Sequence, residues 1–218
     1  MRLPVIIVNF KATEQAVGKN AVSLAKSLEK VAKETGASVA VAVQATDLVA
    51  VKQAVSIPVL AQHVDAVGYG SYTGHIPPAL VKACGAYGTL LNHSEHRLPK
   101  KVLADSIKKA HEAGLWVCCC ANTPADALAV SKLGPDVVAI EPPELIGGDI
   151  SVSVAKPEIL TKTTGKVKTV PVLCGAGVKN TEDVRIARKL GTRGILVASG
   201  ITKAKDPAAA LKALIEGL

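Results

Sequence analysis

Eight short apolar runs recur along the chain, and longer amphipathic or alanine-rich stretches separate them. The runs are apolar at consecutive positions, as is typical of strands buried on both faces of a parallel sheet. The stretches between them follow the 3.6-residue period of a helix. The predicted strands are Val5–Val8, Val39–Val43, Pro58–Ala61, Tyr87–Leu91, Leu115–Cys120, Val137–Ile140, Val170–Cys174 and Gly194–Val197. The predicted helices are Ala16–Glu34, Pro99–Ala113, Ala125–Lys132, Thr181–Leu190 and Pro207–Leu214.

Strands that alternate with helices indicate an α/β fold, with a parallel sheet and crossover helices. Such a sheet is either open and doubly wound or closed into a barrel. An open dinucleotide-binding sheet usually carries glycines after its first strand, whereas here that strand ends in Asn9-Phe10-Lys11. The count of eight units favours a (β/α)8 barrel. No linker or low-complexity segment interrupts the pattern, so we predict one catalytic domain over residues 1–218.

The composition narrows what fills the core. Hydrophobic residues make up 49% of the chain, but Phe, Tyr and Trp together are only 2%, so Val, Ala, Leu and Ile must build the core. The odd number of cysteines includes Cys118, Cys119 and Cys120 in a row. Consecutive strand residues face opposite sides, so these three cannot hold one metal ion together. We expect reduced core thiols in an intracellular protein.

The charge pattern argues against a nucleic-acid partner. The net charge is +8, but the lysines are dispersed along helical faces, as at Lys26, Lys30 and Lys33, with Glu29 and Glu34 among them. No basic stripe interleaved with aromatic residues appears. No apolar run approaches the roughly 18 residues of a membrane span, and the initial apolar stretch is too short for a signal peptide. We expect a cytoplasmic protein that contacts neither membrane nor nucleic acid.

Polar residues that could bind or react with a substrate follow several of the predicted strands. In a barrel the active site lies at the carboxyl ends of the strands. Asn9 and Lys11 are two residues apart and so emerge on the same side, where they could hold an anion. His93 follows the fourth strand and could polarise a carbonyl. Glu141 follows the apolar sixth strand, whose surroundings suit a general base. Taken singly, each also fits a capping, structural or loop residue.

Small residues follow the last two predicted strands. Cys174-Gly175-Ala176-Gly177 ends the seventh strand and Ala198-Ser199-Gly200 the eighth. Small side chains let backbone N–H groups approach a phosphate closely, a recurring feature at this position in barrels. With Lys11 opposite, they predict a phosphate site.

At these positions the chain resembles the triosephosphate isomerase family, and the resemblance runs along its whole length. Asn9-Phe10-Lys11 resembles the family's Asn-x-Lys, and Asn92-His93-Ser94-Glu95-His96-Arg97 resembles its Gly-His-Ser-Glu-x-Arg. Glu141-Pro142 resembles the start of its lid loop. Gly70-Ser-Tyr-Thr73-Gly74 resembles the third loop, which in the family reaches into a neighbouring subunit. The short length, Cys-Gly-Ala-Gly and Glu-Pro-Pro-Glu-Leu-Ile-Gly resemble the compact archaeal branch.

The resemblance implies interconversion of dihydroxyacetone phosphate and D-glyceraldehyde 3-phosphate through an enediolate, in glycolysis and gluconeogenesis. It implies that Glu141 moves the proton, that His93 acts as electrophile, and that Lys11 with Asn9 stabilises the oxyanion. Backbone contacts to the phosphate would come from Ile146, Gly177, Ala198 and Ser199. It implies no cofactor and no metal, and a homotetramer built from dimers, with the Thr73 loop at an interface.

Three departures from the family pattern bear on these expectations. The usual lid tryptophan is replaced near Glu144, the usual Gly-Gly-Ser is Gly175-Ala176-Gly177, and Pro157–Val170 looks too short for a long sixth helix. Two alternatives remain at this point. One is another phosphate-binding barrel enzyme, because the same rim recurs in unrelated barrels. The other is a phosphometabolite sensor without turnover.

Overall fold

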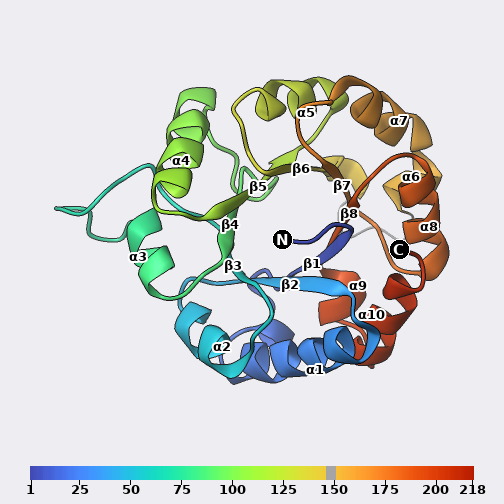
Figure 1. Ribbon diagram of the computed structural model, residues 1–218, viewed down its shortest axis with the longest axis horizontal. Coiled ribbons are helices and arrows are strands. Elements are labelled where there is room, and N and C mark those ends of the chain that lie inside the picture. Colours follow the sequence, from blue (N-terminus) through green and yellow to red (C-terminus); the bar gives the residue numbers. More distant parts are fainter. Residues whose placement is uncertain (146–150) are drawn as a thin grey trace.

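The computed structural model describes residues 1–145 and 151–218. Eight parallel strands close into a barrel in sequence order, with β1 paired to both β2 and β8 (Figure 1). The predicted barrel is therefore confirmed. The strands are β1 (Val5–Asn9), β2 (Ser38–Val43), β3 (Val59–Ala61), β4 (Gly88–Leu91), β5 (Trp116–Ala121), β6 (Val137–Ile140), β7 (Val172–Gly175) and β8 (Gly194–Val197).

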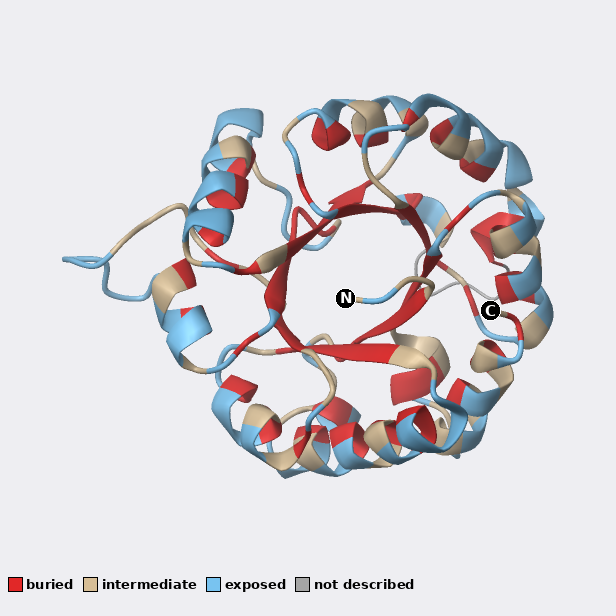
Figure 2. Cartoon of the chain, in the orientation of Figure 1, coloured by how far each residue is buried: buried red, intermediate tan, exposed pale blue. Residues whose placement is uncertain are grey.

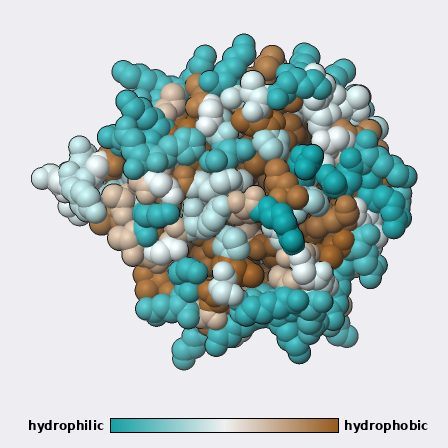
Figure 3. Space-filling model, viewed as in Figure 1, coloured by the Kyte–Doolittle hydropathy of each residue, from teal (hydrophilic) through white to brown (hydrophobic). Residues whose placement is uncertain are grey.

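Helices ring the barrel, and their buried residues lie mostly on the side that faces the strands (Figure 2). The α-helices are α1 (Lys19–Thr35), α2 (Leu48–Ala54), α3 (Pro78–Ala83), α4 (Lys100–Glu112), α5 (Pro124–Ser131), α6 (Val152–Ala155), α7 (Pro157–Lys166), α8 (Thr181–Lys189), α9 (Ser199–Thr202) and α10 (Pro207–Ile215). Two short 3-10 helices are η1 (Glu14–Ala16) and η2 (Pro143–Leu145). Hydrophilic residues dominate the outer ring of the face shown in Figure 3.

The strands alternate between two apolar layers, which is why they read as continuous hydrophobic runs. On β1, Val5 and Ile7 point into the barrel, while Ile6 and Val8 pack under the helices. Alanines such as Ala40 and Ala42 keep the interior layer narrow enough to fill without aromatic side chains. Full burial of each Val, Ile or Leu contributes roughly 1.5–3 kcal/mol, so the two layers supply most of the stabilisation.

The three consecutive cysteines lie in these layers as expected. Cys118 and Cys120 face the barrel interior, and Cys119 faces the helices. All five cysteines are free, and only Cys84 is less than fully buried. Burial raises the pKa of Cys118, Cys119 and Cys120 above that of an ordinary thiol. Among the described residues, no group of three potential ligands could hold a metal ion, and no helix is long and apolar enough to cross a membrane.

The element boundaries differ from the predicted ones for local reasons. The first helix begins at Lys19 rather than at residue 16, because Gly18 takes a left-handed φ of 59° between η1 and α1. β7 begins at Val172, since Pro171 has no N–H to donate to a neighbouring strand. The segment Pro157–Val170 holds one ten-residue helix, α7 (Pro157–Lys166), and the single turn α6 precedes it.

Candidate active site

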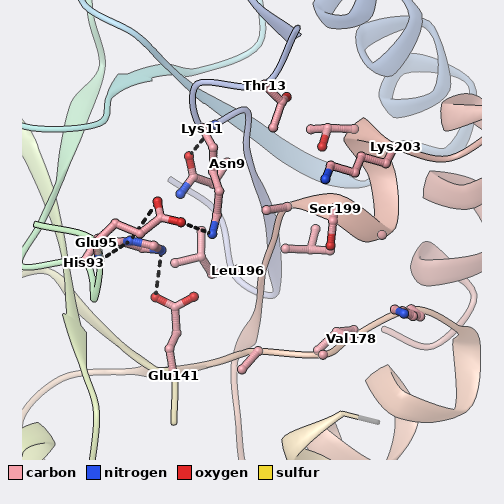
Figure 4. A pocket seen from close by; sticks show the side chains of 17 residues that line it. Asn9, Lys11, Thr13, His93, Glu95, Glu141, Val178, Leu196, Ser199 and Lys203 are labelled. Carbon is pink, nitrogen blue, oxygen red and sulfur yellow. Dashed lines mark hydrogen bonds and ion pairs between the residues drawn. The ribbon is translucent and has the colours of Figure 1, made fainter. Parts of the chain in front are cut away.

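A cavity of about 280 Å³ opens at the carboxyl ends of the strands, where the sequence predicts the site. Figure 4 shows side chains from several strand ends converging on it. The residues that line it are Asn9, Lys11, Thr13, His93, Glu95, Glu141, Ala176, Gly177, Val178, Lys179, Leu196, Val197, Ala198, Ser199, Gly200, Thr202 and Lys203.

Lys11 is held in an unusual backbone conformation just beyond β1. Its φ is 51°, in the left-handed region, which costs a non-glycine residue roughly 1–3 kcal/mol unless the surroundings compensate. Asn9 Oδ1 accepts its N–H at 3.0 Å, and the amides of Gln44 and Gln62 donate to its carbonyl at 3.3 and 3.1 Å. Its ammonium lies 2.7 Å from Glu95 Oε1. Lys11 is therefore a fixed cation beside the buried Asn9 amide.

His93 is 7% exposed and follows Asn92, which also has a left-handed φ, of 60°. The Asn92 side chain fixes this turn, because its amide donates to Cys120 O at 2.9 Å and its carbonyl accepts the Leu98 N–H at 3.1 Å. The Glu95 N–H donates to His93 Nδ1 at 3.2 Å. With Nδ1 accepting this hydrogen bond, Nε2 is the ring nitrogen that can present a proton to the cavity.

The carboxylate of Glu141 faces that ring across the cavity (Figure 4). Glu141 Oε2 lies 3.6 Å from His93 Nε2, and both side chains are less than 10% exposed. Glu141 directly follows β6, and its N–H donates to Ala121 O at 2.8 Å. Among the described residues, Glu141 Oε2 has no hydrogen-bond partner. A buried carboxylate oxygen without a partner is costly, and this one belongs to a side chain that lines the cavity.

The opposite wall of the cavity comes from the loops after β7 and β8. Gly177, Ala198 and Ser199 line it as predicted. The other predicted phosphate contact, Ile146, and the Gly147-Gly148 pair lie outside the described residues. Figure 4 shows Ser199 and Lys203 on the side of the cavity away from Glu141.

Several lining residues were not among the predicted site residues. Glu95 had a signal, since it lies inside the quoted motif around His93, but only the fold shows its contact with Lys11. Thr202 and Lys203 lie on and just after α9, beyond the small residues that follow β8. The Thr202 hydroxyl is buried without a hydrogen-bond partner among the described residues. No feature of the sequence marks either residue.

The charges that line the cavity favour an anion. Lysines 11, 179 and 203 face glutamates 95 and 141. The charge of Lys11 is balanced by Glu95 at 2.7 Å. Among the ion pairs between described residues, none involves Lys203. Positive charge is thus left over on the side of Ser199 and Lys203, away from the Glu141 carboxylate.

Comparison with known proteins identifies the family. The family model described as triosephosphate isomerase matches residues 4–217 of this chain. The chain belongs to the triosephosphate isomerase family. Members of this family interconvert dihydroxyacetone phosphate and glyceraldehyde 3-phosphate, and the family assignment made from the sequence is confirmed.

Individual relatives within the triosephosphate isomerase family match over nearly their whole length. The triosephosphate isomerase of Methanosarcina barkeri is 47% identical, over 99% of both chains. That of Pyrobaculum calidifontis is 49% identical, over 95% of this chain and 92% of its own. That of Methanothermus fervidus is 45% identical, over 99% of both.

A second cavity of about 280 Å³ adjoins the first and shares with it Asn9, Lys11, His93 and Glu95. Its other walls are Ala12, Gln44, Gln62, His63, Ile76, Leu90 and His96. The rings of His63 and His96 lie 4.2 Å apart there, and burial lowers the pKa of His63. The third loop, which lies between β3 and α3, protrudes from the body of the molecule (Figure 1). Tyr69 in the same connection is 75% exposed.

Proposed function

We propose that this chain interconverts dihydroxyacetone phosphate and D-glyceraldehyde 3-phosphate, with Glu141 as the base and His93 as the electrophile. The observation that carries the proposal is the pairing of Glu141 Oε2 with His93 Nε2 at 3.6 Å, beside the fixed ammonium of Lys11. A triose placed between them would offer a C–H bond to the carboxylate and a carbonyl oxygen to the imidazole. These are the two contacts that enolisation requires.

The reaction would proceed by proton transfers at carbon and at oxygen. Glu141 would remove a proton from the carbon next to the carbonyl, and electron density would move onto the carbonyl oxygen. His93 Nε2–H, with Lys11 and Asn9, would stabilise that oxyanion in the enediolate. The proton of the neighbouring hydroxyl would pass to that oxyanion by way of His93, and Glu141 would return its own proton to the other carbon. The aldose and ketose then differ only in where two hydrogens reside. No electron acceptor is consumed and no cofactor is needed.

The phosphate would lie against the opposite wall. We propose backbone contacts from Gly177, Ala198 and Ser199, together with Ile146, as the family resemblance implies. To these we add the Lys203 ammonium and the Thr202 hydroxyl, which line the same wall. The orphaned hydroxyl would gain an acceptor on binding, and the unpaired cation would gain a dianion.

A coupled assay of the purified chain with glyceraldehyde 3-phosphate tests the proposal. We expect turnover, and we expect Glu141→Gln to lower kcat by about 10²–10⁴-fold, since it removes the base but keeps the shape. The matched control is Glu112→Gln, because Glu112 is an exposed carboxylate of α4 that pairs with Lys109 and does not line the cavity. It should leave kcat within about twofold of the unchanged chain.

Each alternative function predicts a different result with other ligands. Turnover of larger phosphorylated sugars but not of trioses would favour another phosphate-binding barrel enzyme. Tight binding of a phosphorylated enediolate mimic without turnover would favour a sensor. Near-normal turnover by Glu141→Gln would remove Glu141 from the mechanism.

We also propose that the chain self-associates as a tetramer built from dimers, acts in the cytoplasm, and folds as one domain over residues 1–218. The protruding Thr73 loop and the adjacent second cavity support self-association, because a loop from one copy could enter the cavity of another. Two hydrogen bonds fix the two ends of the loop. The Asp65 N–H donates to the Ile76 carbonyl, and the Ile76 N–H donates to the Asp65 carboxylate. Light scattering at several concentrations tests the assembly. We expect Thr73→Arg to dissociate it, and a fully active monomer would contradict it.

A further inference from the structure

A buried cluster of polar groups joins the start of α6 to the first turn of α8. Asp183, Ser151 and Ser153 form it, and none of them is more than 6% exposed. The Ser151 hydroxyl donates to Asp183 Oδ1 at 2.7 Å. The Ser153 hydroxyl lies 2.8 Å from that of Ser151 and donates to the Asp183 carbonyl at 3.0 Å. We call these three residues the Ser151–Asp183 clasp.

The second carboxylate oxygen of Asp183 reaches the wall of the cavity. Asp183 Oδ2 accepts the backbone N–H of Lys179 at 2.9 Å and that of Asn180 at 3.3 Å. The bond with Asn180 belongs to the capping box that starts α8. A capping box requires neither the bond to Lys179 nor the one to Ser151. Because Lys179 lines the cavity, the Asp183 side chain spans from α6 to the cavity wall.

The segment held in this way is a strained turn. Ala176 and Gly177 have left-handed φ angles of 70° and 71°. Alanine rarely adopts this region, and such a residue persists only where its surroundings fix it. The Val152 N–H donates to the Ala176 carbonyl at 3.2 Å, so α6 holds one end of the turn. Asp183 holds the other end at Lys179.

We propose that Asp183 is a positioning residue for anion binding. Through Ser151 it holds α6 against the Ala176–Gly177 turn, and this sets the position of the Gly177 N–H at the cavity. Asp183 itself does not line the cavity. That the anion is a phosphate group rests on the proposed function. The role of Asp183 in holding the turn rests on the geometry of the turn alone.

Ser151→Ala in the full-length protein tests the clasp, because it removes the bond from the Asp183 carboxylate to the start of α6 and leaves the capping box intact. The bond from Ser153 to the Asp183 carbonyl remains in this variant. We expect the KM for glyceraldehyde 3-phosphate and the inhibition constant of inorganic phosphate to rise about tenfold, the effect of losing one well-placed hydrogen bond. The kcat/KM for phosphate-free D-glyceraldehyde should change less than about twofold. Asp183→Asn should weaken phosphate binding further, because it disturbs the contacts of both carboxylate oxygens.

Two further variants separate positioning from stability. Asp206→Ala removes the cap of α10, where the Asp206 carboxylate accepts the Ala209 N–H at 3.0 Å, and Asp206 does not line the cavity. It should lower the melting temperature without changing phosphate affinity. Ala176→Gly in the Ser151→Ala background should restore phosphate affinity, because glycine takes the left-handed conformation without strain. A purely structural clasp would show no such rescue.

The outcomes distinguish this inference from the proposed function. Calorimetric titration with inorganic phosphate needs no turnover. Weaker phosphate binding by Ser151→Ala in a protein without isomerase activity would support the clasp and refute the function. Turnover with unchanged phosphate affinity in folded Ser151→Ala would support the function and overturn the clasp. An equal loss of kcat/KM for D-glyceraldehyde and for glyceraldehyde 3-phosphate would also overturn the clasp. Ser153→Ala provides a second, milder variant for the same comparison.

Discussion

The side chain of Glu141 passes directly over the backbone of Gly175, the last residue of β7. A Cβ at Gly175 would overlap Glu141 Cγ and would lie 2.9 Å from both Cδ and Oε1. The φ of Gly175 is not in the left-handed region, so the position requires glycine for space rather than for conformation. β7 thus leaves room for the proposed base that follows β6.

Replacing Gly175 should therefore impair catalysis by moving Glu141. We expect Gly175→Ala to lower kcat by about a hundredfold, as a misplacement of the base by roughly 1 Å would. Gly165→Ala is the matched control, since a Cβ at Gly165 in α7 meets nothing within 4 Å. It should keep kcat and stabilise the fold by roughly 0.5–1 kcal/mol. Steady-state kinetics and chemical denaturation measure both, and unchanged kcat in Gly175→Ala would contradict the argument.

Loss of the Glu95 charge should affect turnover more than stability. Glu95 contacts Lys11 through one carboxylate oxygen at 2.7 Å and lies 3.5 Å from His93 Nδ1 through the other. Its side chain is 58% exposed, so the ion pair contributes less than about 1 kcal/mol to folding. Without it, we expect Lys11 to lose its fixed position and kcat to fall about ten- to a hundredfold in Glu95→Gln. Glu34→Gln removes an exposed ion pair with Lys212 and should leave kcat unchanged.

Lys203 should contribute to phosphate binding. Lys203→Met keeps the length of the side chain but removes its charge, so we expect KM for glyceraldehyde 3-phosphate to rise about ten- to a hundredfold, the effect of a lost charge-assisted hydrogen bond. Turnover of phosphate-free D-glyceraldehyde should be unaffected. Lys205→Met, two residues further at an exposed position, is the control. Equal KM values for the two variants would show that Lys203 does not contact the phosphate.

The interaction between Glu29 and Ser56 should make stability depend on pH. Burial by itself would raise the pKa of Glu29, but hydrogen bonds from the Ser56 hydroxyl and N–H, both 2.6 Å, and the nearby Lys33 lower it from 4.5 to about 2. A lowered pKa stabilises the folded state above pH 4.5, and this stabilisation is lost as the pH falls from 4.5 towards 2. Glu29→Gln should therefore unfold more easily than the unchanged chain at pH 7.

Denaturant titrations at pH 7, 4 and 2 measure this effect. The difference between Glu29→Gln and the unchanged chain should shrink as the pH falls. Glu112→Gln, which removes an exposed ion pair with Lys109, should show little difference at any of the three values. A difference for Glu29→Gln that is constant across the range would indicate that the charge of Glu29 is not involved.

The sequence predicted the strands well because burial on both faces leaves an unbroken apolar run. Two strands, Val137–Ile140 and Gly194–Val197, have the predicted bounds, and the others differ by one or two residues at one or both ends. The helices α2 and α3 were missed because seven and six residues span too few turns to show a period. In the structure α2 packs against α1 and β3, and α3 packs against α4, so tertiary contacts rather than a local signal set their positions.

Several predicted site residues line one cavity because the carboxyl ends of parallel strands meet at one rim. These are Asn9, Lys11, His93, Glu141, Gly177, Ala198 and Ser199. Two features of the site could not be predicted from the sequence. Gly175 was read with the phosphate loop, but the structure shows it making room for Glu141. The contact between Ser151 and Asp183 joins residues 32 apart in the chain, and no local pattern encodes such a tertiary bond.

The burial of four of the five thiols makes the folded chain behave chemically as a protein with a single cysteine. Cys84, at the end of α3, is the only partly accessible one, while the other four are shielded and hard to ionise. Alkylating reagents should therefore attach one label per folded chain and five after unfolding. Counting labels by mass spectrometry would report unfolding directly, and Cys84 offers a unique point for a fluorescent probe.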